Sequence, residues 1–189
     1  MLYRSPLAEA QFSQGEIFSN LIQVRLDVDS IGAGAPRVIP IKHAFAVMMT
    51  QSCDLEADHL LRTGARTSGS LLPSLLFCEA QHSETVQAEI RNSAIWKRVV
   101  RNKDDRYHYL RGATSEVDAA GQGTPDLALG FKRYFSIPTD EVLRRLEIGE
   151  LNRRSCLESP YREHLATRFF YYHLRVALPE DHYQTSSHA

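Results

Sequence analysis

The sequence predicts a mainly β fold with helices (α+β): a small, partly open β-barrel with a long C-terminal helix. Three observations support this. Apolar and polar residues alternate over 22–28, as in a half-buried strand. An apolar run over 44–49 suits a strand buried on both faces. Apolar residues recur every three or four positions over 161–176, as on one helix face.

The first half of the chain is expected to hold two strands and a helix. Turn-forming and small residues over 29–37 predict a hairpin or loop between the strands. Pro40 is expected to break the second strand, leaving a short piece before the apolar run. Asp54 is expected to cap a helix ending near Arg62, since its carboxylate can accept first-turn amide protons.

The second half mixes helices and strands. The expected elements are a helical stretch from Ser83 through Val99, a strand over 107–111, a loop over 112–126, a strand over 131–137, and a helix from Thr139 to near Gly149. Ser159 as cap and Pro160 at the first helical position start the last helix, over about 160–177, and Pro179 ends it.

Composition and charge are those of one globular domain. The chain has 189 residues, 43% of them hydrophobic, enough to bury a core without disulfides or metals. We expect a single domain over 1–189, with a barrel-like core at about 14–137 and a helical C-terminal part at about 139–178. Because 22 basic residues face 23 acidic ones, nucleic-acid binding would need a local basic patch.

The cysteines and the N-terminus predict a cytoplasmic location. Cys53, Cys78 and Cys156 are odd in number and form no C-x-x-C pair, which is typical of a reducing compartment. The N-terminus lacks the apolar region of a secretory signal, and no apolar run is long enough to span a membrane. We expect no membrane association and no cofactor.

The most informative segment is Thr50-Gln51-Ser52-Cys53-Asp54-Leu55, where a buried strand gives way to a helix N-terminus. The helix dipole there favours negative charge. One hypothesis is a catalytic Cys53 with Asp54, served by His43 as base, and with Thr50, Gln51 and Ser52 binding the ligand. His59 and His82 are further candidate bases. The alternative is that Ser52 and Asp54 only cap the helix while Cys53 fills a core pocket.

A metal site is not expected. Cys53, Asp54, Asp58, His59 and Cys78 lack the paired-ligand spacing of structural zinc sites.

Four basic residues are candidates for RNA binding: Arg25, Arg37, Lys97 and Arg101. Lys97 and Arg101 are four residues apart and share a helix face that could meet phosphates. Acidic residues follow at once, and a solvated surface is the alternative. The pairs Arg144-Arg145 and Arg153-Arg154 are interleaved with Glu147, Glu150 and Glu158, so we expect them to form ion pairs.

Two stretches resemble a toxin family. Gly15-Glu16-Ile17 and the segment 46–52, Ala-Val-Met-Met-Thr-Gln-Ser, are similar to the opening of MazF/PemK-type toxins. This resemblance covers about the first third of the chain and implies a dimeric SH3-like barrel that cuts RNA. The family typically has Arg-Pro before the second stretch, whereas this sequence has His43-Ala44-Phe45. The arginine that the resemblance would assign to catalysis is therefore absent there.

A second resemblance spans most of the chain. The Thr-Gln-Ser-Cys-Asp-Leu segment and the late Ser-Pro-Tyr-Arg-Glu-His-Leu-Ala-Thr-Arg-Phe, residues 159–169, resemble a set of uncharacterised bacterial proteins. These share a TQxCDL motif and a C-terminal SPxREHLxxRF helix. The resemblance implies a bacterial protein and carries no activity.

Three functions remain open. The favoured one is a noncatalytic binding or regulatory module in a bacterial toxin–antitoxin or defence-like system, with RNA or a protein as partner. The others are a MazF/PemK-like endoribonuclease and a cysteine-dependent enzyme using Cys53. The absent toxin arginine argues against the second, and the lack of an evident acid–base pair argues against the third.

The last helix also predicts an assembly. Phe170, Tyr171 and Leu174 lie off its main apolar stripe and leave a second apolar surface. We expect this surface to pack against another part of the chain or to form a homodimer.

Overall fold

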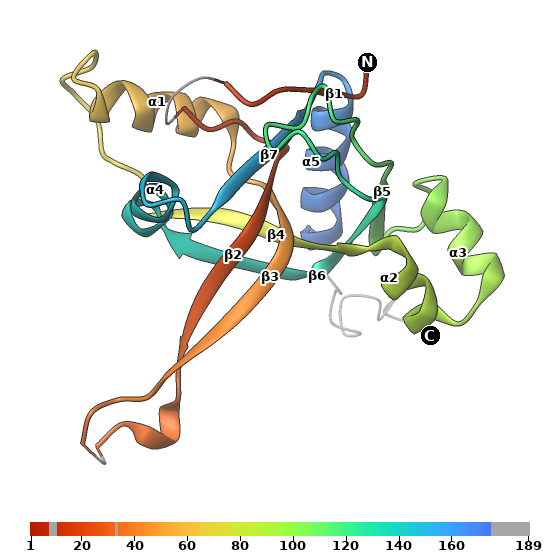
Figure 1. The fold of residues 1–189 in the computed structure, drawn as a ribbon, viewed down its shortest axis with the longest axis horizontal. Coiled ribbons are helices and arrows are strands. Elements are labelled where there is room, and N and C mark those ends of the chain that lie inside the picture. The colour runs from red at the N-terminus through yellow and green to blue at the C-terminus, as the bar shows by residue number, and fades with distance from the viewer. Residues whose placement is uncertain (8–10, 33, 175–189) are drawn as a thin grey trace, which may run out of the picture.

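The protein has an α+β fold built on one open antiparallel sheet (Figure 1). A computed structural model describes residues 1–7, 11–32 and 34–174. Within these residues the sheet has seven strands, in the order β1-β7-β2-β3-β4-β6-β5, with five α-helices packed around it. The two end strands β1 and β5 do not pair, so the expected barrel is not closed. No helix in this part of the chain is long and apolar enough to cross a membrane.

The strands are β1 (Tyr3–Arg4), β2 (Glu16–Leu26), β3 (Val38–Met48), β4 (Ser74–His82), β5 (Tyr107–Leu110), β6 (Leu127–Pro138) and β7 (Asn152–Leu157). The helices are α1 (Ser52–Arg62), α2 (Ser83–Ile90), α3 (Ser93–Val100), α4 (Thr139–Glu147) and α5 (Tyr161–His173), with a 3-10 turn, η1 (Val28–Ser30), between β2 and β3.

Two faces of the sheet carry two apolar clusters. Neighbouring residues on a strand point to opposite faces, and Ile17 and Phe18 accordingly belong to different clusters. The Ile17 cluster includes Leu165 and Phe169, so α5 covers that face. The Phe18 cluster includes residues of α1 and α4, which cover the other face.

Several predicted elements are confirmed, while Pro40 and Asp54 behave differently from expectation. β3 runs through Pro40, which pairs with Val24. That part of β3 pairs on one side only, where the missing proline N–H is tolerated. α1 begins at Ser52 with Gln51 before it, and no side chain caps it. Asp54 lies in the first turn, where the helix dipole favours its charge.

The stretch from Ser83 forms two helices, not one. Arg91 adopts a left-handed conformation, with φ of 52°, and ends α2. Asn92 then starts α3 by accepting hydrogen bonds from the amides of Ala94 and Ile95, at 3.0 and 3.1 Å.

The C-terminal part contributes a strand as well as helices. β7 lies between β1 and β2 and carries Arg153 and Arg154, whose ion partners are Glu16 and Asp118, not the nearby glutamates. In α5, Leu165 and Phe169 are buried, which confirms the core of the expected stripe. Tyr161 is 45% exposed. Val176 and Pro179 lie outside the described residues.

Candidate functional site

A groove joins two features that the sequence predicted separately. It has a volume of about 620 Å³ and lies between the start of α1 and the outer side of α5. We call it the α1–α5 groove. Its lining residues are Gln14, Gln51, Ser52 and Cys53 on one side and Glu163, Ala166, Thr167, Phe170, Tyr171 and Leu174 on the other. Its volume is in the range of ligand sites in proteins.

Backbone and side-chain hydrogen bonds fix the α1 wall of the groove. The Thr50 hydroxyl accepts a hydrogen bond from the amide of Leu76, at 2.8 Å, which ties the end of β3 to β4. The side-chain amide of Gln14 donates to the carbonyl of Met49, at 3.1 Å. Of the three predicted binding residues, Gln51 and Ser52 therefore line the groove, while Thr50 supports them from behind.

Gly15 brings the two walls together. Its amide donates to the carbonyl of Met48, at 2.8 Å, and its carbonyl accepts from the amide of Leu157, at 3.1 Å. Its φ is +79°, and a Cβ there would lie 3.1 Å from the Cγ of Arg162 in α5. A side chain is therefore disfavoured both by the backbone conformation and by the available space.

Cys53 is exposed to the groove and does not fill a core pocket. Its sulfur lies 3.7 Å from Oε1 of Gln51 and 3.8 Å from Oδ1 of Asp54. The Ser52 hydroxyl is buried and has no hydrogen-bond partner. Among the described residues, no histidine, lysine or arginine lines the groove, so neither an imidazole base nor a cation that would stabilise a thiolate stands beside the thiol. This geometry gives little support to a cysteine nucleophile.

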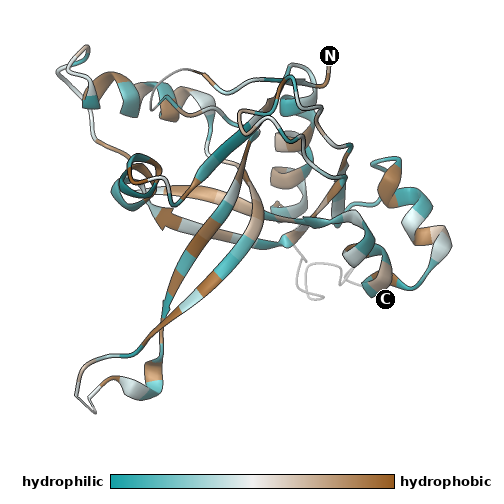
Figure 2. Cartoon of the chain, viewed as in Figure 1, coloured by the Kyte–Doolittle hydropathy of each residue, from teal (hydrophilic) through white to brown (hydrophobic). Residues whose placement is uncertain are grey.

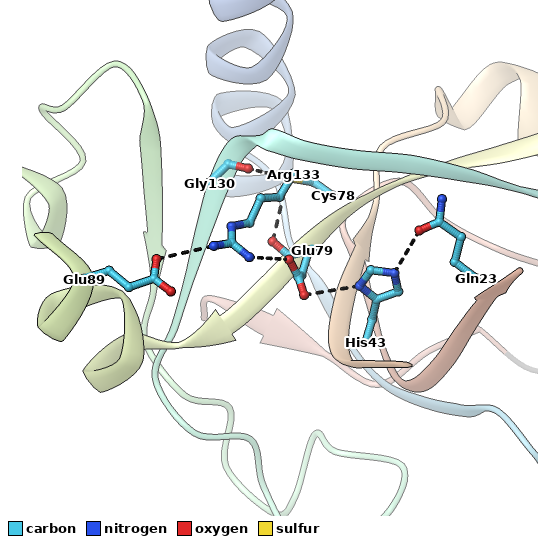
Figure 3. A network of polar contacts seen from close by, with 7 residues as sticks. All are labelled: Gln23, His43, Cys78, Glu79, Glu89, Gly130 and Arg133. Atoms are coloured by element: carbon cyan, nitrogen blue, oxygen red, sulfur yellow. Dashed lines mark hydrogen bonds and ion pairs between the residues drawn. The ribbon is translucent and has the colours of Figure 1, made fainter. Parts of the chain in front are cut away.

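His43 is engaged in a different network (Figure 3). Its Nδ1 lies 3.2 Å from Oε1 of Glu79, and its Nε2 lies 3.3 Å from Oε1 of Gln23. The ring stacks on Phe135, with 4.0 Å between centroids. Because both ring nitrogens have partners and the ring is buried, His43 does not serve as a base for Cys53.

The same network continues across the sheet. Arg133 donates to Glu79, at 3.3 Å, and to Glu89 in α2, at 3.4 Å. The hydrogen bond with His43 holds the pKa of Glu79 below its usual value, with help from Arg133 and against the effect of burial. Figure 3 also shows Cys78, whose sulfur lies 3.6 Å from the carbonyl of Gly130. Burial raises the pKa of this thiol, which makes it inert at neutral pH.

The other two candidate bases lie elsewhere. His59 lines a separate pocket of about 430 Å³ with Arg62 and Leu143. His82 is exposed at the end of β4, edge-on to Phe45. Neither lines the α1–α5 groove. In the described part of the chain, no group of three or more His, Cys, Asp or Glu side chains is placed to hold a metal ion.

The four basic candidates do not form one patch. Arg25 and Arg37 lie on the β2–β3 hairpin, whereas Lys97 is in α3 and Arg101 follows it. The hairpin and α3 lie at opposite ends of the molecule in Figure 1. Arg37 is also paired with Asp27. A phosphate backbone would have no continuous basic track through these four residues.

Buried ion pairs form the polar framework that the sequence did not reveal. Arg154 donates to both carboxylate oxygens of Asp118, at 2.7 and 2.8 Å, and these bonds lower the pKa of Asp118. Arg153 pairs with Glu16 on the neighbouring strand, where burial nevertheless raises the pKa of Glu16. The partners lie 36 and 137 positions apart in the chain, beyond the reach of local pattern reasoning.

Comparisons with known proteins do not indicate a function, so the function has to be inferred from the site. No protein family model, curated protein or solved structure matches this chain at a significant level.

Proposed function

We propose that this protein is a noncatalytic binding module that holds an apolar segment of a partner protein in the α1–α5 groove. The observation that carries the proposal is the α5 wall. Tyr171 and Leu174 are 66% and 74% exposed on it, next to the half-buried Phe170. Exposed aromatic and aliphatic side chains around a hollow are typical of sites for protein ligands.

The charged side chains at the groove indicate what charge the bound segment carries. Glu163 is the one charged side chain among the described residues that line the groove. Arg162 donates to it, at 2.6 Å, and lowers its pKa, so the carboxylate stays ionised at neutral pH. Asp54 is exposed in the first turn of α1, beside the groove. Two carboxylates disfavour an acidic ligand, and we infer that the bound segment carries a lysine or arginine near its apolar residues.

The wider setting is part of the same proposal. The short stretches that resemble MazF/PemK-type toxins support an SH3-like kinship and a bacterial toxin–antitoxin or defence-like system. The three cysteines are all free, which fits a reducing cytoplasm. A homodimer through Phe170, Tyr171 and Leu174 stays a prediction, and it would fill the same groove.

A random dodecamer peptide library tests the proposal. Panning on the wild-type protein, with a Tyr171→Ser/Leu174→Ser variant for counter-selection, should enrich peptides that combine apolar residues with lysine or arginine. Each enriched peptide should slow the alkylation of Cys53, because the thiol lies in the groove. Tyr161→Ser is the matched control, since Tyr161 is an exposed tyrosine of α5 that does not line the groove.

Charge reversal provides a second readout. Glu163→Lys should weaken such a peptide about tenfold, a difference of about 1.4 kcal/mol in binding free energy. No enrichment over the counter-selecting variant would contradict the proposal. Peptides that bind while Cys53 reacts at its free rate would place the binding site elsewhere.

A further inference from the structure

A small pocket lies beside β5, the end strand of the sheet. β5 runs between α5 and α3 in Figure 1, and all three elements contribute lining residues. We call this hollow, of about 230 Å³, the β5 pocket. At about 30 Å³ for each water molecule it has room for about eight, so it suits a ligand of roughly ten non-hydrogen atoms. It shares no lining residue with the α1–α5 groove, so a ligand here is independent of the proposed function.

The inner wall of the pocket includes the buried ring of His108. This residue is 3% exposed, and its Nδ1 has no hydrogen-bond partner among the described residues. A buried polar atom without a partner destabilises a fold, because it gives up its hydrogen bonds to water and gains none. Folds that keep such an atom commonly use it in a functional site. The ring therefore offers a ligand a hydrogen-bonding group that the described part of the chain leaves unused.

A second imidazole stands next to the first. The ring of His164, in the first turn of α5, is edge-on to that of His108, with 5.4 Å between centroids. Figure 2 shows that this helix is hydrophilic at its start and more apolar in its later turns. Burial, Arg168 and His164 together lower the pKa of His108 to about 3, and burial and Arg168 lower the pKa of His164. Both rings are therefore neutral at neutral pH, and each has one N–H donor and one acceptor nitrogen.

The charged side chain on the pocket wall favours an anion. Among the described residues no aspartate or glutamate lines the pocket, whereas the exposed Arg111 does. Arg111 is not tied to an acid in the way that the other arginines of the sheet are. The pKa of Asp126 is lowered mainly by its hydrogen bonds from Tyr109 and the Gly112 amide, and less by the charge of Arg111. The guanidinium is therefore available to a ligand.

Arg168 adds a second positive charge behind the two histidines. Its guanidinium donates to the backbone carbonyls of Asp104 and Tyr107, at 2.5 and 2.9 Å, and to that of Asn102. Neutral carbonyls do not cancel a charge, and the carboxylates of Asp104 and Asp105 raise the pKa of Arg168 less than burial lowers it. The surroundings of the pocket thus attract a negative ligand and repel a metal cation.

We infer that the β5 pocket binds a small aromatic carboxylate. The two imidazoles can each donate an N–H to the carboxylate oxygens, and Arg111 supplies the counter-charge. The rest of the lining suits an aromatic ring, because Tyr109 and Tyr161 offer ring surfaces and Leu110 is buried and apolar. Benzoate is of the right size and combines a ring with a carboxylate.

Titration of the full chain with benzoate tests the inference, followed in ¹H–¹⁵N spectra of the histidine side chains. At neutral pH benzoate should shift the signals of His108 and His164 with a dissociation constant of about 1 mM or less. The signals of His82 and His173, which do not line the pocket, should stay in place. Benzamide has the same shape without the charge and should bind at least about tenfold more weakly. Benzoate should leave the alkylation rate of Cys53 unchanged, which separates this site from the α1–α5 groove.

Two variants locate the ligand. His164→Ala removes an exposed side chain, so the fold should be kept and the dissociation constant of benzoate should rise about tenfold. His82→Ala is the matched control, an exposed histidine outside the pocket, and should leave that constant unchanged. His108→Phe keeps a ring of similar size and removes the unpartnered nitrogen. Its urea unfolding midpoint should therefore be equal to that of the wild-type protein or higher, while benzoate binding weakens.

Three results would overturn the inference. The first is that benzoate at about 10 mM shifts the signals of neither His108 nor His164. The second is that benzamide binds as tightly as benzoate, or that His164→Ala and His108→Phe both keep the wild-type affinity. The third is that inorganic phosphate displaces benzoate at equal concentration, because a general anion site would not require an aromatic carboxylate.

Discussion

The Arg154–Asp118 pair should contribute more to stability than any surface ion pair of this protein. The Asp118 side chain is fully buried, and that of Arg154 is 9% exposed. Besides its two bonds to Asp118, Arg154 donates to the carbonyl of Gly123, at 2.8 Å. The pair thus fastens the loop between β5 and β6 onto β7, and Arg154→Met would leave a buried carboxylate without its counter-charge.

The cost of Arg154→Met can be worked out from these contacts. Two charge-assisted hydrogen bonds are lost, each worth about 1.5–3 kcal/mol. Asp118 keeps hydrogen bonds from the amides of Ala120 and Gln122, at 3.3 and 3.1 Å, which offset part of the loss. Breaking a buried pair from one side costs about 3–5 kcal/mol, and we expect a value in that range. With a urea m-value of about 2–3 kcal/mol/M, the unfolding midpoint falls by about 1–2.5 M.

Urea unfolding at neutral pH measures the effect, with Arg133→Met as the matched control. Arg133 makes the same kind of ion pair at 47% exposure, and its loss should cost about 1 kcal/mol or less.

The difference in unfolding free energy between the wild-type protein and Arg154→Met should also depend on pH. Because Asp118 has a lowered pKa in the folded state, its stabilisation is present above the unfolded value of about 3.9 and is lost as pH falls through the folded value. The two proteins should therefore converge below about pH 4. Equal losses of unfolding free energy in Arg154→Met and Arg133→Met at neutral pH would refute the reasoning.

Three further predictions concern the site and the β2–β3 hairpin. One thiol, Cys53, should react rapidly with a maleimide in the native protein, while Cys78 and Cys156 react only in denaturant, as mass spectrometry can show. Fast labelling of all three in native buffer would contradict the burial of the last two. Gly15→Ala should cost about 1 kcal/mol or more in urea unfolding, because alanine at positive φ is strained; an unchanged midpoint would contradict this. His43→Ala should speed amide exchange in the β2–β3 hairpin, since His43 contacts Gln23 and Phe135, and unaltered exchange would show that the network does not hold this hairpin in place.

Local patterns predicted the elements whose partners are near in sequence. The 22–28 alternation predicted the outer part of β2, but the strand ends at Leu26, and Val24 and Leu26 are half exposed where burial was expected. The i, i+4 spacing of Leu165 and Phe169 predicted the buried stripe of α5. β7 was missed because four of the six residues in its sequence, Asn-Arg-Arg-Ser-Cys-Leu, are polar. Its two arginines are buried only because Glu16 and Asp118 neutralise them. Such compensation depends on tertiary contacts and leaves no periodicity in the sequence.

The candidate site was predicted in its parts but not in its arrangement. Gln51, Ser52 and Cys53 were identified as one group and the second surface of α5 as another, with no expected contact between them. His43 was expected to serve Cys53 as a base, which was wrong, because Glu79 and Gln23 occupy both nitrogens of His43. Glu79 and Gln23 are ordinary polar residues, and no local sequence pattern marks them as partners of His43.

The two walls of the groove come together through β7 and Gly15. β7 pairs with the start of β2 and leads directly into α5, so the end of the chain returns to where β2 begins. There Gly15 accepts from Leu157 of β7, donates to Met48 at the end of β3, and leaves just enough space for Arg162. The Thr-Gln-Ser-Cys-Asp-Leu segment begins just after Met48, and the Ser-Pro-Tyr-Arg-Glu-His-Leu segment begins just after Leu157. Two motifs about a hundred residues apart thus form one groove because a residue without a side chain lets a helix approach a strand end. Their joint occurrence in one chain is what a shared binding surface requires.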